Sequence, residues 1–139
     1  MQCQCPCGTP NSYSDNQLTP PTCTKCQQSL PWIVEVTDLN VGQHLRVPKA
    51  FILDFYADWC APCRSLAPIL DSIAKDFPGK VRILKAKVDH NREIQKLYQA
   101  NSLPTLLIGK GGDTIESPQL VVGLQPKPHL VPIVKSMID

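Results

Sequence analysis

The chain has 139 residues, which is enough for one domain with a hydrophobic core and a short extension. Its 14 Lys and Arg are spread among 12 Asp and Glu, so the formal net charge is only +2. Without a basic stripe, the chain is not expected to bind nucleic acid or an anionic membrane. Its beginning lacks the cationic head and apolar run of a signal peptide, and no run of about 18 apolar residues follows. We therefore expect a cytoplasmic protein with no membrane segment.

The seven cysteines fall into two groups. In a reducing compartment, such a set is more often metal-binding or catalytic than a disulfide framework. One group lies in a segment with almost no aliphatic residues, which cannot fold by hydrophobic burial alone. Cys60 and Cys63 form the other group, within a segment rich in aliphatic residues. We therefore expect a cysteine-rich module at 1–31 and a domain with its own core at 32–139.

From residue 32 onward, the predicted elements alternate between strands and helices. The stretch 50–56 is nearly all apolar, as expected of a central strand covered on both faces. Apolar residues then recur at helical spacing from Leu66 to Phe77, until Pro78-Gly79 ends the helix. The other predicted elements are a strand at 33–36, a short helix or loop at 38–47, a strand at 81–88, a helix at 91–100, strands at 105–108 and 119–122 joined by a turn at 110–113, and a last helix from Leu130 to Met137. This order predicts an α/β fold with a mixed central sheet flanked by helices.

Cys60 and Cys63 lie where the predicted central strand turns into a helix. Two intervening residues let their sulfurs meet at disulfide distance while the first thiol caps the helix. The helix dipole and free N–H groups stabilise a thiolate there, so the pKa of Cys60 should fall below about 8.5. Cys60 is the expected nucleophile. Half of a zinc site has the same spacing, so the spacing alone leaves redox chemistry and metal binding open.

The sequence Asp-Phe-Tyr-Ala-Asp-Trp-Cys-Ala-Pro-Cys at residues 54–63 resembles the signature of the thioredoxin family. Pro68 matches the proline of that family's active-site helix, and Leu103-Pro104-Thr105 resembles its cis-proline loop. The resemblance covers residues 32–139. It departs from the family at Ala61, where glycine is usual, and at Tyr56, where tryptophan is common.

This resemblance implies a thioredoxin fold and a protein-disulfide reductase that acts by dithiol–disulfide exchange. Its partners would be thioredoxin reductase, which draws on NADPH, and proteins that contain disulfides. The catalytic group implied by the resemblance comprises Cys60, Cys63, Asp54 and Lys85. The implied substrate-binding residues are Trp59, Ala61, Pro62, Leu103, Pro104 and Gly123.

Asp54 also stands out on its own, because it is the one charged residue of an apolar strand. Little water would reach it there, and desolvation should raise the pKa of its carboxyl. A carboxylate with a pKa near neutrality can accept the proton of Cys63 when that thiol must attack. Lys85 could adjust that acid, although a lysine on a strand often points to solvent.

The N-terminal cysteines suggest a zinc site. Cys23-Thr24-Lys25-Cys26 has the spacing of half a zinc knuckle, and Cys7-Gly8 resembles the end of the other half. Either Cys3 or Cys5 would complete a four-thiolate site. One intervening residue leaves the knuckle turn between Cys5 and Cys7 incomplete, which favours Cys3. The segment resembles the four-cysteine zinc module of a subgroup of thioredoxins.

Two other functions are compatible with the sequence. In the first, both C-x-x-C pairs share one metal ion and the protein is an interaction module without catalysis. In the second, the protein is a zinc-dependent redox sensor or chaperone-like protein, and oxidation of the N-terminal cysteines releases the metal. The reactivity of Cys60 toward a thiol reagent would separate the first from an oxidoreductase.

Overall fold

The computed structural model describes residues 1–138, except for the side chains of residues 116 and 117. Its main sheet has five strands in the order β3, β5, β4, β6, β7. Strands β3, β5 and β4 are parallel, whereas β6 and β7 each run antiparallel to the preceding neighbour. These strands span Trp32–Glu35 (β3), Ala50–Tyr56 (β4), Val81–Lys87 (β5), Thr105–Lys110 (β6) and Glu116–Val122 (β7). The predicted mixed sheet is confirmed.

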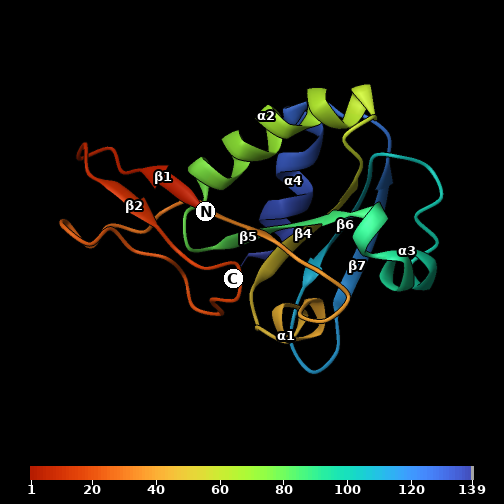
Figure 1. Cartoon of the computed structure of the whole chain (residues 1–139), viewed down its shortest axis with the longest axis horizontal. Coiled ribbons are helices and arrows are strands. Elements are labelled where there is room, and N and C mark those ends of the chain that lie inside the picture. Colours follow the sequence, from red (N-terminus) through yellow and green to blue (C-terminus); the bar gives the residue numbers. More distant parts are fainter. Residues whose placement is uncertain (139) are drawn as a thin grey trace.

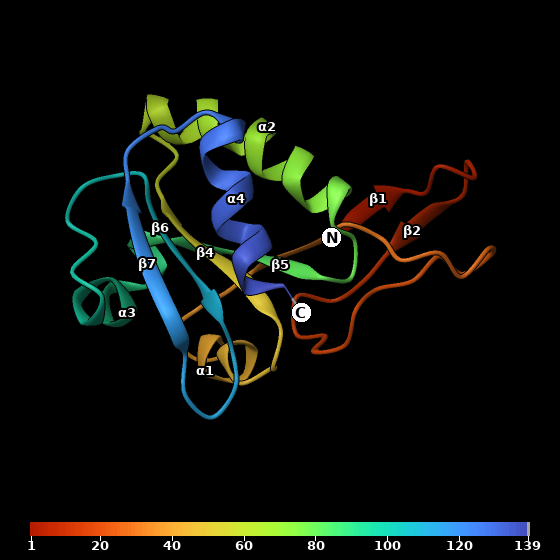
Figure 2. The ribbon, with the colours of Figure 1, turned by 180° about the vertical axis from the view of Figure 1, so that it is seen from behind.

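Helices cover both faces of this sheet (Figures 1 and 2). Helices α2 (Ala61–Asp76) and α4 (Lys127–Met137) lie on one face. The short helices α1 (Val41–Leu45) and α3 (Arg92–Leu97) lie on the other, with the 3₁₀ turn η1 (Val88–His90) before α3. None of the helices within residues 1–138 is long and apolar enough to cross a membrane.

Some element boundaries differ from those predicted. The uncertain stretch 38–47 contains α1, and the helix expected at 91–100 is only α3. That helix ends early because Gln99 has a positive φ of 53°. The turn expected at 110–113 begins after Lys110, where β6 ends, and continues until β7 begins at Glu116.

Strand β4 is the centre of the core. It is hydrogen-bonded to β5 on one side and β6 on the other, and its residues 50–55 are all buried. Phe51, Leu53 and Phe55 point toward the face with α1 and α3, whereas Ala50 and Ile52 point toward α2 and α4. Asp54 follows this alternation and therefore lies on the face with α2 and α4.

A buried cation lies at the start of β5. Arg82 is fully buried, and its guanidinium carbon lies 5.6 Å from the ring centroid of Trp32 and 5.9 Å from that of Phe51. The guanidinium donates hydrogen bonds to the carbonyls of Val47 and Lys49, each at 3.2 Å. Burial lowers the pKa of Arg82 to about 10. This cation ties the loop before β4 to the sheet.

Two short strands precede the main sheet, although none was predicted there. Strands β1 (Gln2–Gln4) and β2 (Pro10–Ser12) form an antiparallel pair. In both views this pair lies beyond the C-terminal end of α2, at the end of the molecule where β5 begins (Figures 1 and 2). The pair is short and its strands are mostly exposed, as expected of a segment with few aliphatic residues.

The segment after β2 covers the edge strand β3. The Tyr13 hydroxyl donates to the carbonyl of Pro31 at 2.7 Å and accepts from the N–H of Ile33 at 3.0 Å. A carboxylate oxygen of Asp15 accepts from the N–H of Glu35 at 3.1 Å. The ring of buried His44 donates through Nε2 to the carbonyl of Asp15 at 2.7 Å. Side chains of the extension thus satisfy backbone groups that an edge strand would otherwise leave open to pairing with another chain.

This contact predicts the effect of a Tyr13→Phe substitution. Loss of the hydroxyl leaves a half-buried N–H of Ile33 and the carbonyl of Pro31 without that partner, so the free energy of unfolding should fall by about 1–3 kcal/mol. Urea denaturation would measure the change, with exposed Ser12→Ala as the matched control from the neighbouring strand. Equal stability of the two variants would contradict a role for Tyr13 in holding the extension.

Candidate active site

The redox pair lies where β4 leads into α2. Cys60 is the N-cap residue of α2 and has extended backbone angles, while Cys63 lies within the first turn. The backbone N–H of Cys63 donates to the sulfur of Cys60 at 3.2 Å. The two residues form a disulfide with their Cα atoms 5.2 Å apart. The first sulfur therefore occupies the position where the helix N-terminus favours negative charge.

A shallow groove of about 400 Å³ runs beside this disulfide. Trp59 forms one part of it, and its side chain is 71% exposed, more than a packing role requires. The Leu103–Pro104 peptide bond is cis, as the resemblance implied, and Leu103 lines the groove. Gly123, with a φ of 88°, donates its N–H to the carbonyl of Pro104 at 2.8 Å. The lining residues are Trp59, Cys60, Ala61, Pro62, Val88, Gln95, Asn101 and Leu103.

The structure therefore brings Trp59, Ala61, Pro62 and Leu103 together beside Cys60, while Pro104 and Gly123 support the loop behind Leu103. Three further residues line the groove that were not predicted from the sequence, namely Val88, Gln95 and Asn101. The position of Val88 near the site could have been predicted, because it ends the predicted strand 81–88. The carboxyl ends of parallel strands meet at one edge of the sheet, so Val88 belongs near the residues that follow β4. No comparable pattern in the sequence places Gln95 and Asn101 at the groove.

Asp54 is buried in the middle of the sheet. Its side chain is 3% exposed, and one carboxylate oxygen is buried without a hydrogen-bond partner among residues 1–138. Burial raises its pKa to about 7, against an opposing effect of Lys85 and with a smaller contribution from Glu35 in the same direction as burial. Lys85 is the direct neighbour of Asp54 on β5 and is half-buried. The expected burial of Asp54 is confirmed; its catalytic role remains a prediction.

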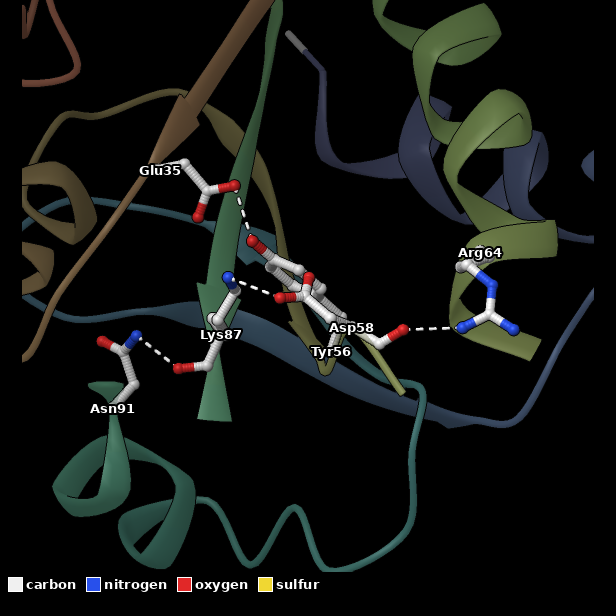
Figure 3. Close-up of polar contacts among 6 residues, drawn as sticks. All are labelled: Glu35, Tyr56, Asp58, Arg64, Lys87 and Asn91. Carbon is white, nitrogen blue, oxygen red and sulfur yellow. Dashed lines mark hydrogen bonds and ion pairs between the residues drawn. The ribbon is translucent and has the colours of Figure 1, made fainter. Parts of the chain in front are cut away.

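The loop between β4 and Cys60 is held from two sides (Figure 3). Lys87 forms an ion pair with the carboxylate of Asp58 at 2.8 Å. Arg64, from the first turns of α2, donates to the backbone carbonyl of Asp58 at 2.6 Å. Asn91 in turn donates to the carbonyl of Lys87 at 2.8 Å. These contacts fix the backbone immediately before Trp59.

Four N-terminal thiols form a second centre. The sulfurs of Cys5, Cys7, Cys23 and Cys26 all lie within 4.8 Å of one another. The sulfur of Cys5 lies 3.5 Å from that of Cys26, and the sulfur of Cys7 lies 3.7 Å from that of Cys23. Four sulfurs at about 2.3 Å from a zinc ion would be about 3.8 Å apart in a tetrahedron. The cluster can therefore hold a metal ion of that size.

Neighbouring groups also suit thiolates at this centre. Asn11 is buried, and its side-chain N–H donates to the sulfur of Cys23 at 3.5 Å. The backbone N–H of Lys25 lies at the same distance from that sulfur. Donors of this kind stabilise negative charge on sulfur.

Cys5, rather than the Cys3 that the spacing favours, lies with the other three thiols. Cys3 lies in β1 and pairs with Asn11 of β2, outside the four-thiol cluster. Cys5 can join Cys7 across one residue because the chain turns back at once. The N–H of Gly8, which has a φ of 92°, donates to the carbonyl of Cys5, and the N–H of Cys5 donates to the carbonyl of Thr9. A glycine at this position permits the left-handed turn.

The two cysteine groups are far apart. The thiol cluster belongs to the segment beyond the C-terminal end of α2, whereas Cys60 caps its N-terminus (Figures 1 and 2). A helix of 16 residues rises by about 24 Å. Cys60 and Cys63 are also bonded to each other. The alternative in which both C-x-x-C pairs share one metal ion is therefore wrong.

Comparison with known proteins agrees with this geometry. The thioredoxin family model matches residues 32–136, more than half of the chain. The chain belongs to the thioredoxin family. It is 38% identical to thioredoxin from Staphylococcus saprophyticus over 103 residues, which cover 74% of this chain and 95% of that protein. It is 39% identical to thioredoxin from Staphylococcus aureus over 101 residues, or 73% and 93% of the two chains.

Solved thioredoxin structures share the fold. A mutant thioredoxin from Halobacterium salinarum has a TM-score of 0.69 at 26% identity and covers 80% of this chain and 95% of its own. Oxidised mitochondrial thioredoxin 3 from Saccharomyces cerevisiae has a TM-score of 0.66 at 28% identity, over 75% and 94% of the two chains. The expected thioredoxin fold is confirmed, and this member of the family is a thiol–disulfide oxidoreductase.

Burial of Asp54 predicts how stability depends on pH. Its pKa of about 7 in the folded protein exceeds the value of about 3.9 for an unfolded chain, so ionisation above pH 4 increasingly favours unfolding. Asp54→Asn removes this penalty and should raise the free energy of unfolding at pH 8 by on the order of 2–4 kcal/mol. Near pH 4 the difference should be much smaller.

Denaturation of the oxidised protein at both pH values would measure this effect. Asp71→Asn is the matched control, because Asp71 is exposed on α2. A gain for Asp54→Asn that does not grow with pH would show that Asp54 is ionised without penalty.

Proposed function

We propose that this chain is a protein-disulfide reductase in which Cys60 is the attacking thiol and Cys63 the releasing thiol. The hydrogen bond from the N–H of Cys63 to the sulfur of Cys60 carries this assignment. That donor and the start of α2 stabilise a thiolate on Cys60. The adjacent groove and exposed Trp59 give a substrate protein a surface beside that sulfur.

The first step is attack of the Cys60 thiolate on a substrate disulfide. A bond forms between Cys60 and one substrate sulfur, and the other substrate sulfur leaves as a thiolate. Leu103 lies across the groove beside a cis-proline, where its backbone groups could pair with an extended substrate segment. Such pairing would hold the substrate sulfur near Cys60.

The second step releases the substrate. Cys63 transfers its proton to the carboxylate of Asp54 and attacks the sulfur of Cys60, so that the Cys60–Cys63 disulfide forms and the second substrate sulfur leaves. A carboxyl with a pKa of about 7 suits this role, because it can accept a proton at neutral pH. Lys85 neighbours Asp54 and moderates its charge.

Two electrons must then return to the Cys60–Cys63 disulfide. We propose thioredoxin reductase, which draws on NADPH, as their source, and disulfide-containing proteins as their destination. Membership of the family, rather than a contact in the structure, supports these partners, and a reductase of this kind would act in a reducing compartment such as the cytoplasm. Turnover of insulin disulfides with reductase and NADPH is the direct test.

The two cysteines should respond differently to substitution. Cys63→Ser should accumulate mixed disulfides with substrate proteins, because Cys60 can still attack but release is blocked. Cys60→Ser should accumulate none and should lose essentially all reductase activity. Non-reducing electrophoresis after incubation with an oxidised substrate would detect the adducts. Trapping by Cys60→Ser but not by Cys63→Ser would reverse the assignment.

We also propose that residues 1–31 form a structural zinc module. The four clustered thiols match the donor set and spacing of a closed tetrahedral site. With so little apolar area to bury, this segment would gain much of its order from the metal. Zinc would be held by Cys5, Cys7, Cys23 and Cys26.

Metal analysis tests the module. Protein purified without chelator should contain about one zinc ion per chain, and Cys5→Ser should lose most of it. Cys3→Ser is the matched control and should keep it, because Cys3 lies outside the cluster. Chelation should disorder the extension while the Cys60–Cys63 domain retains its fold and at least part of its activity.

Other outcomes would count against this module. Loss of zinc on replacing only Cys60 and Cys63 would contradict the proposed ligands. Release of zinc by mild peroxide, with a change in protein binding, would favour the redox-sensor alternative.

A further inference from the structure

Three charged residues lie in one row across the sheet. Lys85 of β5 is the direct partner of Glu35 on β3 and of Asp54 on β4. Directly opposed residues of parallel strands point to the same face, and neighbouring strands are about 4.8 Å apart. Lys85 therefore lies between two carboxyl groups, with Glu35 at the edge of the sheet and Asp54 in its interior.

Tyr56 contacts both Glu35 and Lys85 of this row. It lies two residues after Asp54 on the same face of β4. Its hydroxyl donates to a carboxylate oxygen of Glu35 at 2.7 Å, and Figure 3 shows these two side chains meeting across β5. The Lys85 ammonium lies 4.7 Å from the centroid of the Tyr56 ring. One tyrosine thus fixes Glu35 and contacts the lysine that neighbours Asp54.

The backbone of Glu35 is fixed as well. Its N–H donates to the carboxylate of Asp15, in the extension that covers β3. Both ends of Glu35 are therefore held, although the side chain itself is exposed. The carboxylate of Glu35 therefore has a defined position, whereas that of an exposed glutamate without partners moves freely in solvent.

The other groups around Asp54 have little net charge. Lys87 and Asp58 form an ion pair on the same side of the sheet. Cys63, in the first turn of α2, is the thiol whose proton the proposed release step passes to Asp54. Leu106 of β6 is the direct partner of Asp54 on its other side, and the core of this face is apolar, including Leu66 and Leu70 of α2 and Leu130 and Val134 of α4. Lys85 and Glu35 are thus the charges that act most directly on Asp54.

We propose that Glu35 is a positioning residue of the exchange reaction, which acts through Lys85 and Tyr56 and adjusts how readily Asp54 accepts the proton of Cys63. This proposal rests on the proposed role of Asp54 in the release step. The negative charge of Glu35 attracts Lys85 and opposes ionisation of Asp54. Lys85 alone would lower the protonated fraction of Asp54 at neutral pH. The charge of Glu35 opposes this effect and keeps that fraction closer to one half.

Glu35→Gln is the test, since the amide oxygen can still accept from Tyr56 while the charge is gone. Two unit charges about 10 Å apart interact enough to shift a pKa by about 0.3–1 unit. The apparent pKa of release, measured by single turnover between pH 5 and 9, should fall by this amount. Release at pH 6 should become about two- to five-fold faster, because more Asp54 is ionised. Asp71→Asn removes a charge elsewhere and should match the wild type.

Three further measurements distinguish a charge effect from a general structural one. The carboxyl ¹³C resonance of Asp54 should titrate with the same downward shift in Glu35→Gln. The shift should diminish as ionic strength approaches about 1 M, because Glu35 is exposed. In a Tyr56→Phe background, Glu35→Gln should have less than half its effect, since the carboxylate then lacks the hydrogen bond that fixes it near Lys85.

Asp54→Asn separates this proposal from the one on which it rests. If Asp54→Asn leaves the pH dependence of release unchanged, Asp54 is not the proton acceptor and the proposed role of Asp54 fails. If Asp54→Asn abolishes that dependence but Glu35→Gln matches the wild type within about 0.1 unit, the role of Glu35 alone is overturned. The role of Glu35 would also be overturned if the pKa read from the Asp54 resonance were the same in Glu35→Gln and in the wild type.

Discussion

Burial of strand β4 on both faces is the constraint on which the rest of the structure depends. Its neighbours β5 and β6 satisfy its backbone groups, and helices cover its two faces, so its position and direction cannot vary. The chain leaves β4 at Tyr56 and enters α2 at Ala61. Cys60 must therefore lie at a helix N-terminus, beside the end of β5. The chemistry of the sulfur follows from where the central strand ends.

The same burial isolates Asp54 from water. An acid on an exposed strand would be ionised at neutral pH, whereas this one has a pKa of about 7 because it lies within the core. Because the pKa of Asp54 is raised in the folded state, its ionisation lowers the stability of the folded protein at high pH. The same raised pKa lets the carboxyl exchange a proton at neutral pH. Charges at the edge of the sheet can then act on that carboxyl, because Lys85 lies between Glu35 and Asp54 in one row across the strands.

The sequence predicted those parts of the site that depend on local pattern. The central strand, the helix after it and the cysteine pair at their junction follow from apolar periodicity and C-x-x-C spacing. Burial of Asp54 followed from its apolar neighbours. The partnership of Glu35 with Tyr56 could not be predicted, because it requires strand order and register between segments 21 residues apart. The choice between Cys3 and Cys5 could not be settled from the sequence for a similar reason, since the turn at Gly8 depends on backbone angles rather than spacing.

The two tryptophans lie in very different surroundings. Trp59 is largely exposed beside the Cys60–Cys63 disulfide, whereas Trp32 is fully buried under Arg82, next to the strand edge that the extension covers. An exposed indole emits at longer wavelength than a buried one, so the fluorescence of the protein contains two separable signals. One reports on the groove and the other on the packing at the start of β3. A single emission spectrum can therefore follow both ends of the molecule without an added label.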